Sequence, residues 1–415
     1  MSTFLPADIL LPKTEDMMRW SVVACDQFTS EPDYWKRVEE TVASTGAIST
    51  LSLILPEAYL GTEKEASKVE SIHRTMQKYL EEERFTIRPS SYIYIERTMA
   101  NGKIRQGIIG MVDLEDYDYA KGATSPIRAT EATVVERIPP RMRVRKGAPL
   151  ELPHILLLMD DEPGQVIEPL AELTDTFEKV YDFDLMEEGG HITGWVLSEE
   201  AKAAFGERIA AYEKTAALPY AMGDGNHSLA TAKACYEALK EAHPDEDLSG
   251  HPARYALVEL ENIHCQALEF EPIHRILTGV NPYELLTELK QNAGKPITIG
   301  ENEEGSRGYE LTWITKESRG YIYLNDAVSP VEVGVLQPFL DDYLKDHEGE
   351  IDYIHGADVV ERLAKEENAI GFLLPPMAKS KLFEGVISDG ALPRKTFSMG
   401  HAKEKRYYLE ARKIL

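Results

Sequence analysis

The feature that most constrains this chain is a glycine-containing turn between an apolar segment and an amphipathic one. Residues 218–222 are apolar and resemble a strand, whereas apolar residues recur at helical spacing over residues 229–240. The sequence Asp-Gly-Asn-His-Ser lies between them at residues 224–228, and another glycine precedes it. A strand, a glycine turn and a helix are therefore expected in direct succession.

The turn has the composition of an anion-binding site. Backbone N–H groups at a helix start are unpaired and carry partial positive charge, so they bind phosphate. The two glycines would let a ligand approach the backbone closely. The candidate residues are Gly223, Gly225, Asn226 and Ser228 for phosphate, and Asp224 and His227 as titratable groups. The alternative is an ordinary tight turn in which Asn226 or Ser228 caps the helix.

Composition and charge exclude several classes of protein. Hydrophobic residues make up 43% of 415 residues, enough for a sizeable core, and the formal net charge of −26 disfavours binding to nucleic acid or to an anionic membrane. No apolar run approaches the roughly 18 residues of a membrane span, and the start of the chain lacks a signal-peptide pattern. Three cysteines in no paired spacing fit a reducing cytoplasm. We therefore expect a cytoplasmic protein with a small-molecule partner; its oligomeric state stays open.

The segment patterns predict a mixed α/β fold in which mixed sheets carry flanking helices. Asn101-Gly102 is a hairpin signal between two strand-like runs. The expected helices cover residues 31–45, 63–84, 199–214 and 335–344; the expected strands cover residues 92–97, 104–114, 155–159, 191–197, 254–260, 309–315, 321–324 and 370–374. Residues 291–308 are the best linker candidate. We expect an N-terminal region of residues 1–153, a central region of residues 154–290 that contains the turn, and a C-terminal region of residues 291–415.

A basic island interrupts the acidic background. Residues 128–146 contain six basic and two acidic residues, a net charge of 6 − 2 = +4, and residues 394–413 are also basic. An arginine can bind two oxygens of a phosphate or carboxylate at once, so Arg137 and Arg141 are candidate anion-binding residues. Pro139-Pro140 would hold them on a rigid loop. A solvated face paired with nearby acids is the alternative.

Other motifs give less specific indications. Residues 271–275 place an acid, an imidazole and a guanidinium close together in the chain, ending in His274 and Arg275. No pair has zinc-type spacing, so a metal site would have to assemble from distant residues. The P-loop, the third glycine of the dinucleotide motif and the nucleophile elbow are missing from the sequence.

Several motifs together resemble the bacterial and archaeal family called domain of unknown function 1015, nearly end to end. The resemblance is carried by Trp-Ser-Val-Val-Ala-Cys-Asp-Gln-Phe-Thr-Ser at residues 20–30, by residues 128–133, 136–141, 223–228 and 271–275, and by Leu-Pro-Arg-Lys-Thr-Phe-Ser-Met-Gly-His at residues 392–401. These motifs are polar and contain glycine or proline, which suits loops over a rigid scaffold. We expect one pocket to collect their side chains: Asp26, Arg137, Arg141, Asp224, His227, His274, Arg275, Lys395 and His401.

The turn is also similar to the nucleotide-binding turn of the ParB, sulfiredoxin and free-serine-kinase superfamily. There, a Gly-x-His-Arg or Asp-Gly-His-His-Arg sequence binds nucleotide phosphates. Ser228 stands where that pattern has a basic residue, so the missing charge must come from elsewhere, and residues 137–146 are the obvious donor. The resemblance implies a ParB/sulfiredoxin-like turn and helix in the central region.

The leading hypothesis is a nucleotide-dependent, kinase-like phosphotransferase acting on a small metabolite. The backbone of residues 223–228 would bind phosphates, and the two arginines of the island would offset their charge. Asp224 or His227 would accept the substrate hydroxyl proton, or Asp224 would bind Mg²⁺, with Glu131 a second candidate for either role. The rivals are a non-catalytic nucleotide- or metabolite-binding module, and a metal-dependent hydrolase that uses three side chains: Asp224, His227 and His274.

Overall fold

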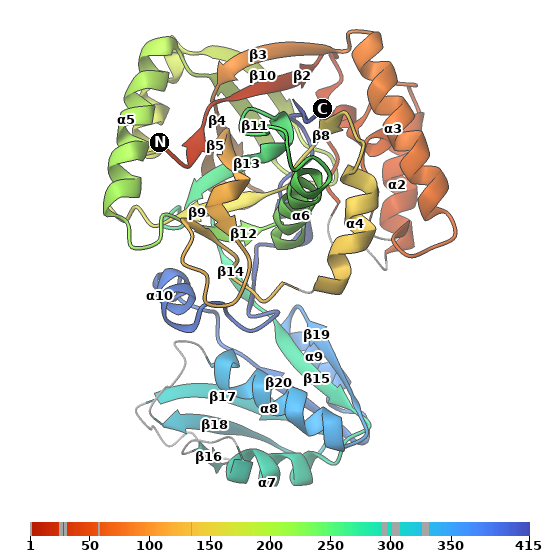
Figure 1. Ribbon diagram of the computed structural model, residues 1–415. Helices are drawn as coiled ribbons and strands as arrows, with labels where there is room; N and C mark the ends of the chain where they lie inside the picture. Colours follow the sequence, from red (N-terminus) through yellow and green to blue (C-terminus); the bar gives the residue numbers. More distant parts are fainter. Residues whose placement is uncertain are drawn as a thin grey trace. The chain divides into compact units, whose positions relative to one another are not determined.

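A computed structural model describes residues 2–24, 28, 31–56, 59–133, 135–292, 297–300, 308–325 and 332–415. It has the predicted mixed α/β fold, and the chain divides into two compact units (Figure 1). Unit 1 comprises Met1–Ala129, Thr133–Leu268 and Gly400–Leu415, and unit 2 comprises Thr130–Ala132 and Glu269–Met399. These two units are groups of residues that pack together, and each combines separate stretches of the chain. The predicted division into three consecutive regions is a different kind of division and stays a prediction.

A mixed sheet runs through unit 1. Its described strands follow the order β10-β11-β4-β5-β13-β9-β12-β7-β6, and β1 pairs with β5. The strands are β1 Phe4–Leu5, β4 Ile93–Thr98, β5 Ile104–Asp113, β6 Tyr117–Asp118, β7 Ile127–Arg128, β9 Leu156–Met159, β10 Glu178–Asp184, β11 His191–Val196, β12 Tyr220–Asp224 and β13 Tyr255–Asn262. The β6–β7, β7–β12 and β9–β13 pairs are parallel, and the other pairs in this sheet are antiparallel.

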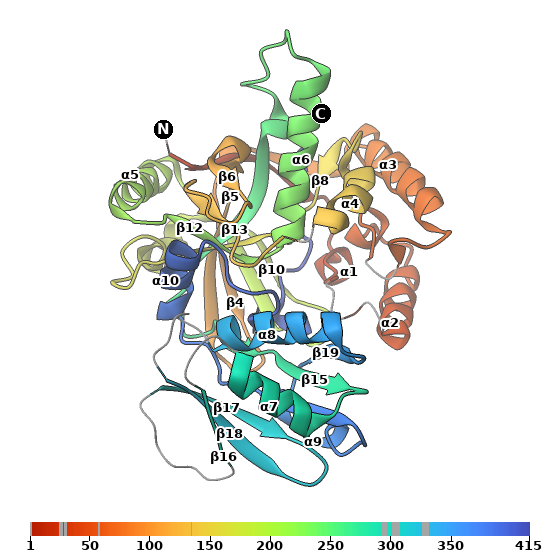
Figure 2. The same ribbon diagram turned by 60° about the horizontal axis from the view of Figure 1, so that its bottom comes forward.

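Helices of unit 1 pack against this sheet through two apolar cores. Because successive strand residues point to opposite faces, Ile93 and Ile95 of β4 join one core while Tyr94 between them joins the other. The first core includes side chains of α1 Met17–Trp20, α2 Pro32–Ala43 and α3 Glu65–Glu81, and the second includes those of α5 Glu199–Thr215 and α6 Asn226–Ala242. Helix α4, Ile138–Arg145, packs beside α6 (Figure 2).

Most elements predicted for unit 1 are confirmed. The Asn101-Gly102 hairpin joins the antiparallel strands β4 and β5, and Gly102 has the positive φ of 78° that such a turn needs. The predicted helices at residues 31–45, 63–84 and 199–214 correspond to α2, α3 and α5. Two short sheets complete the unit: β2 Ala7–Pro12 with β3 Phe85–Ser91, and β8 Leu150–Glu151 with β22 Arg412–Lys413.

Unit 2 contains an antiparallel sheet of order β16-β18-β17-β20-β15-β19. Its strands are β15 His274–Thr278, β16 Ile297–Gly300, β17 Gly308–Ile314, β18 Arg319–Asn325, β19 Glu350–Ile354 and β20 Ala369–Leu373; β14 Phe270–Pro272 pairs separately with β21 Phe397–Met399. The helices are α7 Pro282–Asn292, α8 Val333–Asp346, α9 Ala357–Leu363 and α10 Ser380–Asp389. Within the described ranges, none of the helices combines the length and hydropathy that a bilayer crossing requires.

The predictions for unit 2 have a mixed outcome. The hairpin at residues 309–324, the helix at residues 335–344 and the strand at residues 370–374 are confirmed as β17 with β18, α8 and β20. The linker predicted at residues 291–308 is wrong in its described part, because α7 runs to Asn292, β16 pairs with β18 and β17 begins at Gly308. Residues 293–296 and 301–307 of that segment lie outside the described residues.

Candidate functional site

The strand, turn and helix predicted at residues 218–240 are present as β12 and α6. Gly223 lies at a break in the register between β12 and β9, and Gly225 is the N-cap of α6 in the left-handed conformation, with φ 79°. A Cβ atom on Gly225 would lie 3.1 Å from the Ile155 Cα, so the turn requires glycine.

The helix starts two residues earlier than predicted, at Asn226 rather than near Ser228. Gly225 is the N-cap and no side chain caps α6, so the alternative in which Asn226 or Ser228 caps the helix is wrong. The physical reason is that the left-handed Gly225 turns the chain, and its carbonyl accepts the N–H groups of Ser228 at 2.9 Å and Leu229 at 3.0 Å. The first N–H groups of an α-helix point out of its N-terminal end, where they can donate to a ligand.

Polar atoms around this helix start are oriented by the turn itself. The Gly225 N–H donates to the Asp224 Oδ1 at 2.8 Å, which holds the carboxylate against the turn. The Asn226 Oδ1 is buried and has no hydrogen-bond partner among the described residues. A buried acceptor with no partner costs free energy unless water or a ligand satisfies it.

A lysine that the sequence analysis did not single out lies at the turn. The Lys405 Nζ is 3.4 Å from the Asp224 Oδ2, and the side chain is only 9% exposed. A cation from the end of the chain therefore lies beside the turn. The basic stretch at residues 394–413 was the only signal of it.

His154 is the second unanticipated side chain. It precedes β9, and β9 pairs with the last residues of β12, so it lies at the same sheet edge as the turn. Its Nε2 is 3.4 Å from the Ser228 Oγ, and its Nδ1 is 2.7 Å from the Tyr408 hydroxyl. An imidazole therefore connects the first turn of α6 to the same C-terminal segment that carries Lys405.

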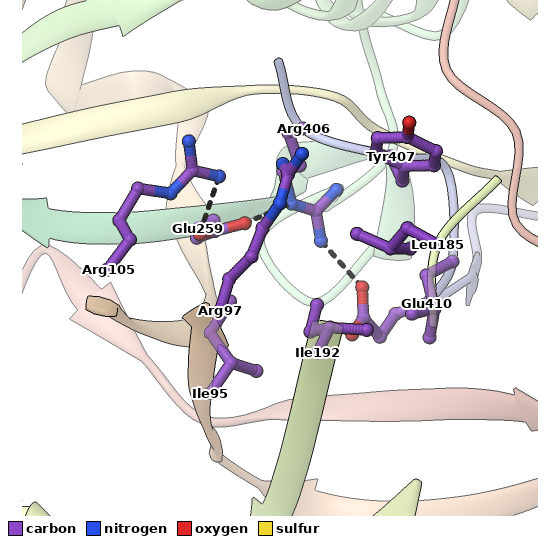
Figure 3. A pocket seen from close by; sticks show the side chains of 10 residues that line it. Ile95, Arg97, Arg105, Leu185, Ile192, Glu259, Arg406, Tyr407 and Glu410 are labelled. Carbon is purple, nitrogen blue, oxygen red and sulfur yellow. Dashed lines mark hydrogen bonds and ion pairs between the residues drawn. The ribbon is translucent and has the colours of Figure 1, made fainter. Parts of the chain in front are cut away.

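Buried arginines hold that C-terminal segment in place (Figure 3). The Arg97 guanidinium donates to the carbonyls of Lys403 at 2.6 Å, Glu404 at 3.1 Å and Lys405 at 2.8 Å. Burial, and secondarily the nearby Arg105, lower the pKa of Arg97 to about 10. Arg406 donates to Glu259 at 2.8 Å and to Glu410 at 2.7 Å, and to the carbonyl of the residue before His154. The backbone on both sides of Lys405 is thus tied to the strands of the sheet.

The basic island lies on a helix, so the predicted rigid loop is wrong. Pro139 and Pro140 stand at the start of α4, where a missing N–H group costs no helical hydrogen bond. Two of its basic residues form ion pairs, Arg143 with Glu65 and Arg145 with Glu151. Arg137 is exposed and Arg141 is half-buried, and both lie in unit 1 with the turn. Their role in binding an anion stays a prediction.

A second group of predicted residues meets within unit 2. Glu131 accepts the Thr396 N–H at 3.3 Å, and burial raises its pKa, although the Lys395 N–H and the charges of Lys395 and Arg275 oppose that shift. Lys395 has φ 57°, a left-handed conformation that costs a non-glycine residue on the order of 1 kcal/mol. Three candidates from distant motifs, Glu131, Arg275 and Lys395, therefore surround one strained turn.

The remaining candidates have varied surroundings. His274 is buried in unit 2, its Nδ1 accepts the Leu374 N–H at 3.1 Å, and burial lowers its pKa to about 4, so it is a neutral core residue. Arg275 is fully buried beside it and donates to Gln337 at 3.0 Å. His401 is exposed in unit 1. Asp26 lies outside the described residues, and the convergence of all these side chains on one pocket stays a prediction.

Comparisons with known proteins identify one family for this chain and several solved structures of low similarity. Residues 5–413 match the family model described as protein of unknown function (DUF1015). No curated protein sequence matches the chain significantly. Its fold is similar to that of free serine kinase in complex with AMP, with 14% identity, a TM-score of 0.41, and coverage of 73% of this chain and 91% of that one.

Two further solved structures are similar at the same level. They are SbnI with a C-terminal truncation from Staphylococcus aureus, with 10% identity, a TM-score of 0.39 and coverage of 70% and 82%, and a conserved hypothetical protein from Pyrococcus furiosus, with 12% identity, a TM-score of 0.37 and coverage of 72% and 90%. TM-scores below 0.5 leave the function to be argued from the site's own residues.

Proposed function

This chain belongs to the DUF1015 family of proteins of unknown function, and from its own residues we propose that it is a nucleotide-dependent phosphotransferase acting on a small metabolite. The observation that carries the proposal is the start of α6. Gly225 begins this helix in the left-handed conformation, where an added Cβ would lie 3.1 Å from the Ile155 Cα, and the buried Lys405 ammonium lies beside the same turn. Backbone N–H groups and a lysine at a helix N-terminus are what nucleotide phosphates require.

The proposed reaction transfers the γ-phosphoryl group of a nucleoside triphosphate. A hydroxyl oxygen of the substrate attacks the γ-phosphorus while the bond to the oxygen between the β- and γ-phosphates breaks, and the nucleoside diphosphate leaves. Asp224 or His227 accepts the proton of the attacking hydroxyl. Lys405 offsets the charge on the transferred group, with Arg137 and Arg141 as further candidates.

Asp224 also fits a role with Mg²⁺. Its Oδ2 contacts Lys405 at 3.4 Å, longer than a short charge-assisted hydrogen bond, so this oxygen can exchange its partner. Protein sites for Mg²⁺ typically use one or two carboxylates together with the phosphates of the nucleotide. The ion would neutralise charge on those phosphates, and Asp224 would be its protein ligand.

The test is a binding and turnover assay on the full chain. We expect ATP with Mg²⁺ to stabilise the protein by about 2.7 kcal/mol at a hundredfold excess over its dissociation constant. ADP release should then depend on a small hydroxyl-containing substrate, and His227→Ala should reduce turnover more than affinity if the imidazole acts in the chemical step.

Three other results would contradict the phosphotransferase proposal. Stabilisation by nucleotide without turnover of any tested metabolite would indicate a non-catalytic binding module. Stoichiometric metal at Asp224 with hydrolysis in the absence of nucleotide would indicate a hydrolase. No stabilisation by any nucleotide would refute the phosphate site.

A further inference from the structure

An imidazole and two carboxylates from neighbouring helices of unit 2 meet at one point, and none of the three has a role in the proposed reaction. Glu284 and Glu288 lie one helical turn apart on α7, and His347 directly follows α8. One ligand atom from each lies within 4.8 Å of the others, and no other trio of His, Cys, Asp or Glu in the described ranges does this. Helices α7 and α8 lie side by side (Figure 2).

The orientation of the His347 ring is set by the end of α8. Its Nδ1 lies 3.0 Å from the Tyr343 carbonyl oxygen, and the two rings stack with centroids 4.0 Å apart. A carbonyl oxygen only accepts hydrogen bonds, so Nδ1 carries a hydrogen and Nε2 of the neutral ring carries the lone pair. Histidines that bind metals commonly have this arrangement, with the other ring nitrogen donating to a carbonyl.

The lone pair of His347 faces a second acceptor. Its Nε2 is 3.1 Å from the Glu288 Oε1, so a cation, either a proton or a metal ion, must lie between them. His191 shows the arrangement that suits a proton alone, because carboxylates contact both of its nitrogens at 2.6 and 2.7 Å and raise its pKa. In His347, by contrast, Nδ1 donates to the Tyr343 carbonyl, and Nε2 faces the Glu288 carboxylate with the Glu284 carboxylate nearby.

The two carboxylates lie one turn apart on the same helix. Like charges one turn apart destabilise a helix. No lysine or arginine among the described residues forms an ion pair with Glu284 or Glu288, whereas Glu367 in the same unit pairs with Lys316 at 2.9 Å. Negative charge is therefore concentrated at this point.

We propose that Glu284, Glu288 and His347 form a binding site for a divalent transition metal ion, with Zn²⁺ as the best match. Imidazole nitrogen together with carboxylate oxygen suits zinc, whereas Mg²⁺ and Ca²⁺ prefer oxygen ligands alone. Three protein ligands leave the fourth tetrahedral position to water. The bound ion connects α7 to the C-terminal end of α8 and stabilises unit 2.

The experiment uses the full chain after removal of metal with a chelator. Calorimetric titration with ZnCl₂ should show one ion per chain and a higher midpoint temperature of unfolding, and MgCl₂ should show neither. Glu288→Gln and His347→Gln should each weaken zinc binding at least tenfold. The matched control is His243→Gln, which removes an exposed pair with Glu246 at 2.9 Å in unit 1 and should leave zinc binding unchanged.

Glu284→Gln keeps the test decisive if the other variants fold poorly. Glu284 is exposed and has no ion-pair partner among the described residues, so this variant should unfold at the wild-type temperature without metal and gain less from zinc. The proposal is wrong if the wild type binds no stoichiometric zinc. It is also wrong if all three variants bind zinc as the wild type does, and the contact is then an imidazolium–carboxylate ion pair only.

Discussion

Replacing Gly225 by alanine is the sharpest test of the proposed turn. An L-residue in the left-handed conformation costs roughly 1–2 kcal/mol, and Gly225 has φ 79°. The new Cβ would also lie 3.1 Å from the Ile155 Cα. That backbone cannot move freely, because the Ile155 carbonyl accepts the Glu259 N–H at 3.0 Å, so overpacking adds about 1 kcal/mol or more. We expect Gly225→Ala to destabilise unit 1 by about 2–3 kcal/mol.

Gly206→Ala is the matched control. Gly206 lies inside α5, and a Cβ there meets nothing within 4 Å. Alanine in a helix interior is more favourable than glycine by about 1 kcal/mol, so the same substitution should stabilise the protein at this position. The two variants are therefore expected to change stability in opposite directions.

Urea denaturation followed by tryptophan fluorescence measures both effects. Trp20 and Trp195 report on unit 1, and the midpoint should shift while the slope stays constant. If Gly225→Ala is as stable as the wild type, the left-handed turn is wrong and the phosphate-binding geometry falls with it. If the variant folds but binds Mg²⁺–ATP as the wild type does, the turn only starts a helix and the phosphotransferase proposal fails.

Three further predictions concern Lys405, Arg97 and His274. Lys405→Met should weaken nucleotide binding tenfold or more in a calorimetric titration, whereas Lys403→Met, which removes an exposed pair with Glu188, should not. Arg97→Met leaves three buried carbonyls without donors, each at a cost of about 1–3 kcal/mol, so thermal unfolding should show a loss of at least about 3 kcal/mol in the free energy of unfolding. A variant as stable as the wild type would show that Arg97 does not hold the C-terminal segment. The pKa of His274 is about 4 in the fold and 6.5 unfolded, so the neutral form is stabilised and stability falls as pH drops from 6.5 to 4, by up to about 3 kcal/mol. His274→Gln should flatten that profile in denaturation at pH 4.5 and 7.5, and an unchanged profile would assign the acid sensitivity to other groups.

Local patterns were enough to predict most helices and strands. The Asn101-Gly102 hairpin follows from two residues that tolerate positive φ, and the helix predicted at residues 199–214 is α5. The errors arose where one local signal admits two structures. Pro139-Pro140 disfavours the interior of a helix but is well placed in its first turn, and only the packing of α4 beside α6 decided between these.

At the candidate site, too, some features could be predicted from the sequence and others only from the tertiary structure. The sequence alone was sufficient to predict a strand, a glycine turn and a helix at residues 218–240, because hydrophobic periodicity and glycine placement act over a few residues. It did not identify Lys405 or His154, which reach the turn through the pairing of β9 with β12 and through the arginines that bind the C-terminal segment. Tertiary structure alone decided these contacts, because which distant segments meet depends on sheet register and on the burial of charged groups, and neither leaves a periodic signal in the chain.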